Sequence, residues 1–129
     1  MSAERSPAFR NFLELLHATG RLRMEAIEVG GLVGAERDEA EAMLLEALPK
    51  DPRAADALAD LGSQRGARAI AARLPRTKGF ERISLASALH RLTGFPDAEE
   101  ILLEGTRDSN NYTRNHAIHL LHRIRSPRV

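Results

Sequence analysis

An apolar motif recurs along this chain at a nearly constant interval. Three segments align around Leu58, Leu89 and Leu121, which stand 31 and 32 residues apart. A weaker fourth copy lies upstream over residues 26–34, where Gly30 takes the place of the expected leucine. Self-similarity at a fixed period is typical of repeat architectures, in which each unit packs mainly against its neighbours. The recurrence therefore predicts a stack of similar units.

The pattern within each unit is helical. Apolar residues recur at intervals of three and four nearly everywhere, and no segment shows sustained alternation with period two, so we expect an all-α fold. Further helices are predicted between the copies, over residues 7–18, 36–48, 65–74 and 96–105. Ser6-Pro7, Asp51-Pro52 and Pro96-Asp97 offer capping chemistry at helix starts, and glycines are expected at helix ends. Those glycines are Gly20, Gly34, Gly62, Gly79 and Gly94.

One copy carries a family resemblance. Residues 54–62 (AADALADLG) follow a turn at residues 48–52 (LPKDP), and together they resemble the second helix of a HEAT repeat and its preceding turn. The resemblance implies a right-handed α-α superhelix of about four helix pairs, with all 129 residues in one domain. The repeats would span approximately residues 7–34, 36–62, 64–94 and 96–125. It implies little about activity, because HEAT arrays mostly serve as scaffolds and binding surfaces.

Composition indicates which kinds of site and which cellular compartment to expect. The chain has no cysteine, which removes disulfides and thiolate metal sites. Its apolar runs are far shorter than the roughly 20 residues of a membrane span, and residues 1–7 lack the pattern of a signal peptide. We therefore expect a cytoplasmic protein without a membrane segment.

Charge is distributed unevenly along the chain although the net charge is only +1. Residues 36–60 hold eight acidic and three basic side chains, whereas residues 64–91 hold seven basic and one acidic. Asymmetry of this kind often reflects a partner rather than the fold.

Helix geometry converts the repeat into a predicted binding surface. In HEAT-like arrays the second helix of each pair lines a concave groove, and the side opposite the buried leucines should face it. The groove would change from acidic at its N-terminal end to basic and histidine-rich at its C-terminal end. Leu32 is expected there together with the predicted contact residues, which are Glu25, Glu28, Arg53, Asp56, Asp60, Ser84, Ser87, Arg91, His116, His119 and Arg123.

The predicted groove contains arginine but no aromatic residue, so aromatic anchors would come from the partner. The only tyrosine, Tyr112, follows a polar loop and is expected to pack its ring while exposing its hydroxyl. In that loop Asn110 or Asn111 should take a left-handed or a capping conformation.

Three chemical alternatives compete with protein binding. His116, His119 and His122 share one helix, but they spread over about 120° and no nearby carboxylate completes a metal site. Glu25, Glu28, Asp56 and Asp60 form a possible carboxylate cluster for acid–base chemistry, although carboxylates more commonly attract basic partners. Nucleic-acid binding is disfavoured by an acidic half-groove without tryptophan. The basic residues available for phosphate contacts would be Arg65, Arg68, Arg73, Arg76, Lys78 and Arg82.

These features predict a non-enzymatic protein–protein interaction module without cofactor or metal, which binds a partner of unknown identity through the groove. It could act as an adaptor or as a neutralising partner of an enzyme, a part that small stand-alone solenoids in bacteria can play. The alternative is a nucleic-acid-binding or ligand-processing HEAT-like enzyme. We expect a monomer or a weak end-to-end oligomer.

Overall fold

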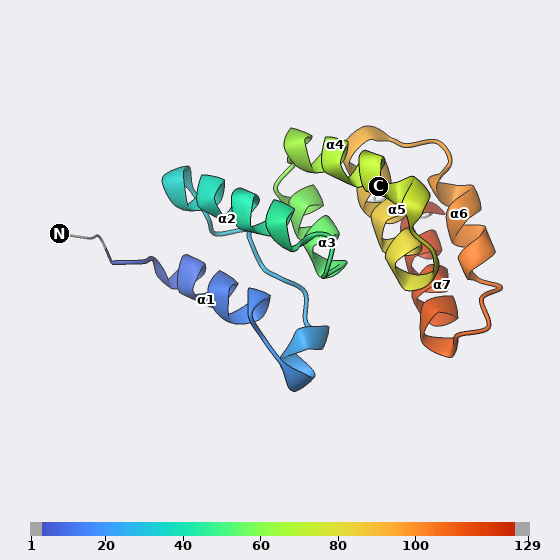
Figure 1. The fold of residues 1–129 in the computed structure, drawn as a ribbon, viewed down its shortest axis with the longest axis horizontal. Helices are drawn as coiled ribbons and strands as arrows, with labels where there is room; N and C mark the ends of the chain where they lie inside the picture. The colour runs from blue at the N-terminus through green and yellow to red at the C-terminus, as the bar shows by residue number, and fades with distance from the viewer. Residues whose placement is uncertain (1–3, 126–129) are drawn as a thin grey trace.

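The computed structural model describes residues 4–125, with the side chains of all of these except residues 21 and 22, and its regular elements are all helices (Figure 1). The all-α prediction is therefore confirmed, with no β-strand in the described range. No helix between residues 4 and 125 combines the length and the apolar character that crossing a membrane requires. The α-helices are α1 (Pro7–Leu16), α2 (Gly34–Ala47), α3 (Arg53–Asp60), α4 (Gln64–Arg73), α5 (Gly79–Thr93), α6 (Ala98–Gly105) and α7 (Asn111–Arg125), and the short 3₁₀ helices are η1 (Gly20–Met24) and η2 (Leu74–Arg76).

Consecutive helices pack against one another from α1 to α7, and three pairs of alternate helices also meet, namely α2 with α4, α3 with α5, and α5 with α7. Helix α3 packs on α5, and α5 packs on α7, so these three form a row across the molecule (Figure 1). Helix α2 contacts α3 and α4, and α6 packs on both α5 and α7. The row of α3, α5 and α7 carries the three strong copies of the sequence motif, and Leu58, Leu89 and Leu121 are all buried in it as the pattern predicted.

The apolar core has two parts. The larger part runs from α1 to α6, and the smaller lies where α6 and α7 meet α5. Ser6 fixes the start of α1 as predicted, because its hydroxyl accepts a hydrogen bond from the Phe9 N–H while Pro7 occupies the first helical position. The largest fully buried side chains are Phe9, Phe12, Leu44, Leu58, Ile70, Leu85 and Leu102.

The weak upstream copy of the motif is not a helix, so the prediction of an eighth helix is wrong. Residues 26–33 form an irregular segment between η1 and α2. Ile27 and Val29 are buried while Ala26, Glu28 and Gly30 are exposed, which is the period-two burial of an extended chain. Consecutive glycines at 30 and 31 raise the entropic cost of a helix there. Leu32, expected in the groove, is buried in the core instead.

Three predicted glycine stops are helix starts, and the first of them, Gly20, begins η1 beyond the end of α1 at Leu16. Gly62 and Gly94 do follow α3 and α5 with positive φ, as expected. Gly34 and Gly79, however, open α2 and α5, where a positive φ turns the chain from extended Val33 or Lys78 into the helix. Helix α5 therefore runs over 15 residues, from Gly79 to Thr93.

Helix capping follows the prediction in part. The Asp51 carboxylate accepts a hydrogen bond from the Arg53 N–H at the start of α3, at 3.1 Å. The Asp97 side chain makes no such bond at the start of α6, so that part of the prediction is wrong. Ser63, for which the sequence predicted no role, caps α4 by accepting from the Gly66 N–H.

Gly105 marks the tightest helix contact and gives a stability test. A Cβ atom at this position would lie 2.8 Å from Ile83 Cγ2 and 2.9 Å from Ala117 Cβ, and neither group can move without its helix. We expect Gly105→Ala to lower the free energy of unfolding by about 1–3 kcal/mol in urea titrations, despite the better helix propensity of alanine. Gly30→Ala is the matched control, since an added Cβ atom there would have no neighbour within 4 Å. Equal stabilities of the two variants would contradict the close packing of α6 on α5 and α7.

Candidate binding cavity

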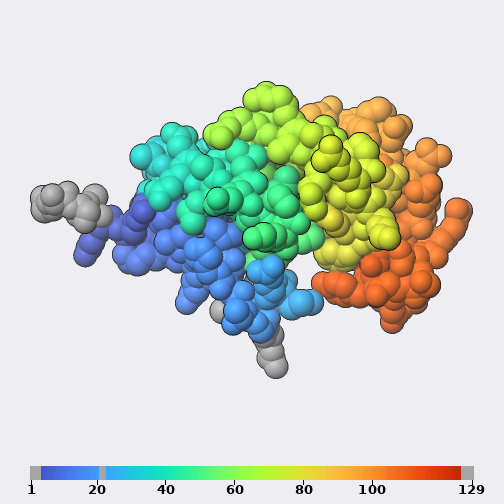
Figure 2. Space-filling model, viewed as in Figure 1, coloured from blue at the N-terminus to red at the C-terminus, as the bar shows by residue number. Residues whose placement is uncertain are grey.

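A cavity of about 340 Å³ opens between the central row of helices and the segment that follows η1. In Figure 2 it lies between the light-blue segment near residues 23–30 and the orange-red start of α7. The predicted groove residues Arg53, Asp56, Ser84, Ser87, His116 and Arg123 line it. The structure therefore brings together residues of α3, α5 and α7 that the repeat pattern placed on one surface. The other lining residues are Arg23, Met24, Ala26, Ile27, Asp51, Pro52, Ala57, Phe80, Tyr112 and Leu120.

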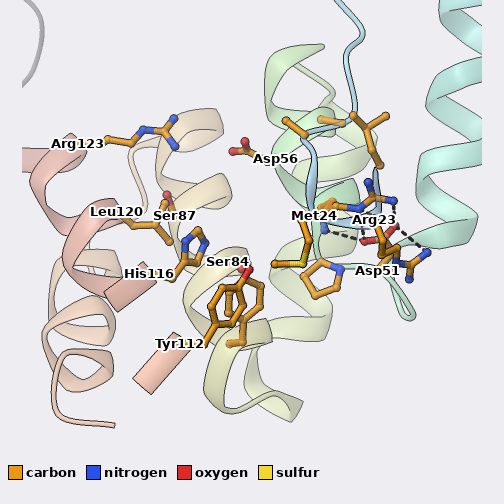
Figure 3. Close-up of a pocket in the computed structure, with 16 residues that line it drawn as sticks. Arg23, Met24, Asp51, Asp56, Ser84, Ser87, Tyr112, His116, Leu120 and Arg123 are labelled. Carbon is orange, nitrogen blue, oxygen red and sulfur yellow. Dashed lines mark hydrogen bonds and ion pairs between the residues drawn. The ribbon is translucent and has the colours of Figure 1, made fainter. Parts of the chain in front are cut away.

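Small side chains leave the space open. Ala57 of α3 and Ser84 and Ser87 of α5 lie in the lining between longer side chains from α7 and from η1 (Figure 3). Leucine at these positions would fill such a volume, as it does elsewhere in the core. The cavity is therefore encoded by small residues on the central row.

An aromatic wall lines the cavity, so the expectation of a groove without aromatic residues is wrong. The Phe80 ring stacks on Tyr112, with ring centres 5.0 Å apart and planes 8° apart. Phe80 also stacks on the His116 ring at 4.6 Å and 18°. Offset or parallel ring pairs of this kind stabilise a fold by about 0.5–1.5 kcal/mol beyond area burial. Tyr112 packs its ring as predicted, yet the residue remains 55% exposed.

The aromatic residues continue the predicted helix face. Phe80 lies one helical turn before Ser84, and Tyr112 lies one turn before His116. Each aromatic residue therefore lies on the same helix face as the predicted groove residue that follows it. The start of α7 is fixed by Asn110, whose side-chain oxygen accepts from the Thr113 N–H at 2.9 Å. This is the capping geometry, and no described residue other than glycine has positive φ. Extending the predicted faces by one turn towards the N-terminus would have found both rings.

Arg53 is a structural residue as much as a lining residue. Its side chain is 14% exposed, and its Nε and Nη2 atoms donate to the Asp51 carboxylate, whose side chain is 6% exposed. Nη1 donates to the Glu25 carbonyl at 2.8 Å, and Nη2 also donates to the Leu15 carbonyl at 3.1 Å. The guanidinium thus ties α3 to the end of α1 and to the residue after η1, which corrects its assignment as a groove cation available to a partner.

In the middle of the predicted acidic-to-basic gradient, an arginine pairs with two of the acidic side chains. Arg91 of α5 reaches both carboxylates of α3, at 2.6 Å to Asp56 Oδ1 and 2.5 Å to Asp60 Oδ1. One arginine therefore bridges two successive members of the row and offsets charge that was predicted to face a partner. At the far end, Arg123 forms no ion pair with another residue in the described part of the chain.

Five predicted contact residues do not line the cavity. Glu28 and Asp60 line a separate hollow beside α1 and residues 28–32, and Glu28 accepts a hydrogen bond from the Asn11 amide. Glu25 is exposed on the irregular segment, and Arg91 and His119 lie on the row outside the cavity lining. The four carboxylates considered for acid–base chemistry are thus divided between two hollows and the surface.

His116 has an altered protonation equilibrium. Partial burial lowers its pKa below the ordinary value of 6.5, and the charges of His119 and Arg123 act in the same direction. The Asp56 carboxylate opposes them. The neutral ring is therefore favoured in the cavity near neutral pH. Among the side chains that the structure describes, no three histidine, aspartate or glutamate residues are grouped closely enough to hold a metal ion.

The comparisons with known proteins give no relative for this site. The chain matches no protein-family model, no curated protein and no solved structure.

The Arg53 tie predicts a large loss of stability on truncation. Arg53→Ala leaves the buried Asp51 carboxylate without its main partner and frees two backbone carbonyls, so the free energy of unfolding should fall by about 2–4 kcal/mol. Arg68→Ala is the control, because Arg68 is an exposed residue of α4, and its effect should stay within about 0.5 kcal/mol. Urea unfolding followed by circular dichroism measures both. Similar losses in the two variants would show that Arg53 does not hold the irregular segment.

The lowered pKa of His116 predicts a pH dependence of stability. Because the folded protein holds this proton less tightly than the unfolded chain, its contribution to stability is present above pH 6.5 and is lost as the pH falls below that value. Wild type should therefore lose more stability than His116→Gln between pH 7.5 and pH 5. His122→Gln, which removes an exposed histidine from the same helix, should behave like wild type. The idea fails if His116→Gln and wild type lose stability equally over this range.

Proposed function

We propose that this protein is a non-enzymatic protein-binding module, built as a right-handed HEAT-like superhelix, that binds a protein partner on the row of α3, α5 and α7. The cavity at the centre of this row is the observation that carries the proposal. Protein-binding surfaces concentrate their energy in a few anchors that fill pockets, with aromatic and arginine side chains prominent among them. The row offers such a pocket together with Phe80, Tyr112 and Arg123 at its edge.

The repetition of the row supports a binding surface over a catalytic centre. Phe80, Ser84, Ser87 and Arg91 on α5 stand at the same spacing as Tyr112, His116, His119 and Arg123 on α7. Equivalent positions on successive helices give an extended surface that can follow a partner, as in repeat proteins generally. An adaptor or a neutralising partner of an enzyme would both use a surface of this kind.

The charges outside the cavity give less support to the nucleic-acid alternative. Several arginines of the basic stretch are close to carboxylates: Arg65 to Glu41 at 3.6 Å, Arg73 to Glu81 at 2.5 Å, and Arg82 to Glu104 at 4.0 Å. Phosphate binding depends on cations that can release counterions from the nucleic acid, and paired arginines contribute less to it.

Site-specific photo-crosslinking tests the proposal. A benzophenone amino acid replaces either Tyr112 at the cavity or Ala72 on the exposed side of α4, and both proteins are irradiated in native cell extract. We expect a single protein adduct from position 112 and none of the same mass from position 72, identified by mass spectrometry. The same adduct from both positions would overturn the assignment of the surface. A nuclease-sensitive adduct at position 112 would favour the nucleic-acid alternative.

A further inference from the structure

The two sides of the cavity differ in chemistry. Tyr112, His116, Leu120 and Arg123 line one side from a single helix, α7, while Met24 projects from the opposite side at the end of η1 (Figure 3). Met24 is 64% exposed, which is unusual for a large apolar residue and leaves its thioether free to contact a ligand. A thioether facing aromatic rings provides a favourable slot for a further ring, because sulfur and aromatic faces attract.

The size of the cavity fits one large side chain. Its volume of about 340 Å³ is at the lower limit of small-molecule sites, which range over roughly 300–1,000 Å³. In Figure 3 the labelled lining residues follow one another from Tyr112 past Ser84 and Ser87 to Arg123 and Asp56. An aromatic side chain can therefore enter beside Tyr112 and Met24 while the chain that carries it passes near Arg123.

Among the charged side chains that line the cavity, Arg123 is the one without an ion-pair partner in the described part of the chain. The buried Asp51 is bound by Arg53, with Arg23 a further partner at 3.7 Å, and Asp56 is paired with Arg91. His116 favours its neutral form. Arg123 is exposed and has no carboxylate partner among the described side chains. A ligand that complements this arrangement has an anionic group near Arg123, because guanidinium binds carboxylate in a bidentate geometry.

We propose that the cavity receives an aromatic side chain of a partner protein segment, and that Arg123 binds an aspartate or glutamate close to that residue in the same segment. This inference rests on the proposed function and specifies which partner chemistry the row recognises. The row continues beyond the cavity to Arg91, Asp60 and His119. A segment can therefore pass through the site rather than end in it, which favours an internal acidic side chain over a terminal carboxylate.

Selection from a random heptapeptide library displayed on phage tests this chemistry directly. The immobilised proteins are wild type, Ser84→Trp, Arg123→Glu and the control Arg68→Glu. Ser84→Trp places a ring inside the cavity, whereas Arg123→Glu reverses the charge at its end. Arg68→Glu makes the same charge change on α4, away from the cavity.

We expect wild type and Arg68→Glu to enrich the same peptides, with an aromatic residue and an acidic residue within about three positions of each other. A synthetic peptide of that consensus should bind Ser84→Trp and Arg123→Glu at least about tenfold more weakly in calorimetric titrations. Tyr112→Ala should show a similar loss. Because Tyr112 is more than half exposed, this variant provides a cavity test that does not depend on repacking the helices.

The outcomes separate the inference from the proposed function. A consensus that lacks the aromatic residue or carries lysine or arginine instead of an acid, but whose peptide still binds Ser84→Trp weakly, overturns the inference and leaves the binding surface standing. Peptides that bind all four proteins equally overturn both. Failure to enrich any peptide overturns the inference, and the crosslinking at position 112 then decides the proposed function alone. N-acetyltryptophan binding as tightly as the peptide would assign the cavity to small aromatic acids instead.

Discussion

The tie between Arg53 and Asp51 holds together the part of the molecule where the helical repeat fails. Residues 26–33 form no helix, and the Arg53 hydrogen bond to the Glu25 carbonyl lies directly before them. A single guanidinium supplies bonds to the carbonyls of Leu15 and Glu25 while its charge is balanced by a buried carboxylate. A planar group with several fixed donors can bind two carbonyls and a carboxylate at once, whereas a lysine ammonium could not match this geometry.

That tie also creates one side of the cavity. By fixing the end of η1 against α3, it holds Met24 across from the aromatic wall of α5 and α7 (Figure 3). A regular helix over residues 26–34 would have presented Glu25, Glu28 and Leu32 to the groove. Instead the extended segment buries Ile27, Val29 and Leu32 and leaves Met24 exposed. The departure from the repeat thus adds Met24, Ala26 and Ile27 to the cavity lining in place of Glu25, Glu28 and Leu32.

The sequence predicted the helices well where local signals agreed. The buried leucines of α3, α5 and α7, the Ser6 cap and the glycines after α3 and α5 follow from periodicity and from backbone sterics alone. The prediction from sequence failed where the same residue or pattern is compatible with two different local structures. Gly34 and Gly79 can end or begin a helix, and the short apolar run at Ile27 and Val29 fits both periods. For the site, six of the predicted groove residues line the cavity, but the pattern did not include Phe80, Tyr112 or Met24.

Which features could be predicted from the sequence depends on how far apart in the sequence the interacting residues lie. By itself the sequence determined the positions of most helices and the shared face of α3, α5 and α7, because these depend on contacts within a few residues and on a repeated pattern. Only the tertiary structure decided that Arg53 is a tie, that Arg91 pairs with both Asp56 and Asp60, and that Phe80 of α5 stacks on Tyr112 of α7. Apart from the local Arg53–Asp51 pair, each of these contacts joins residues 28 or more positions apart, such as Arg53 with Glu25. Their partners are chosen by packing, which no local pattern encodes.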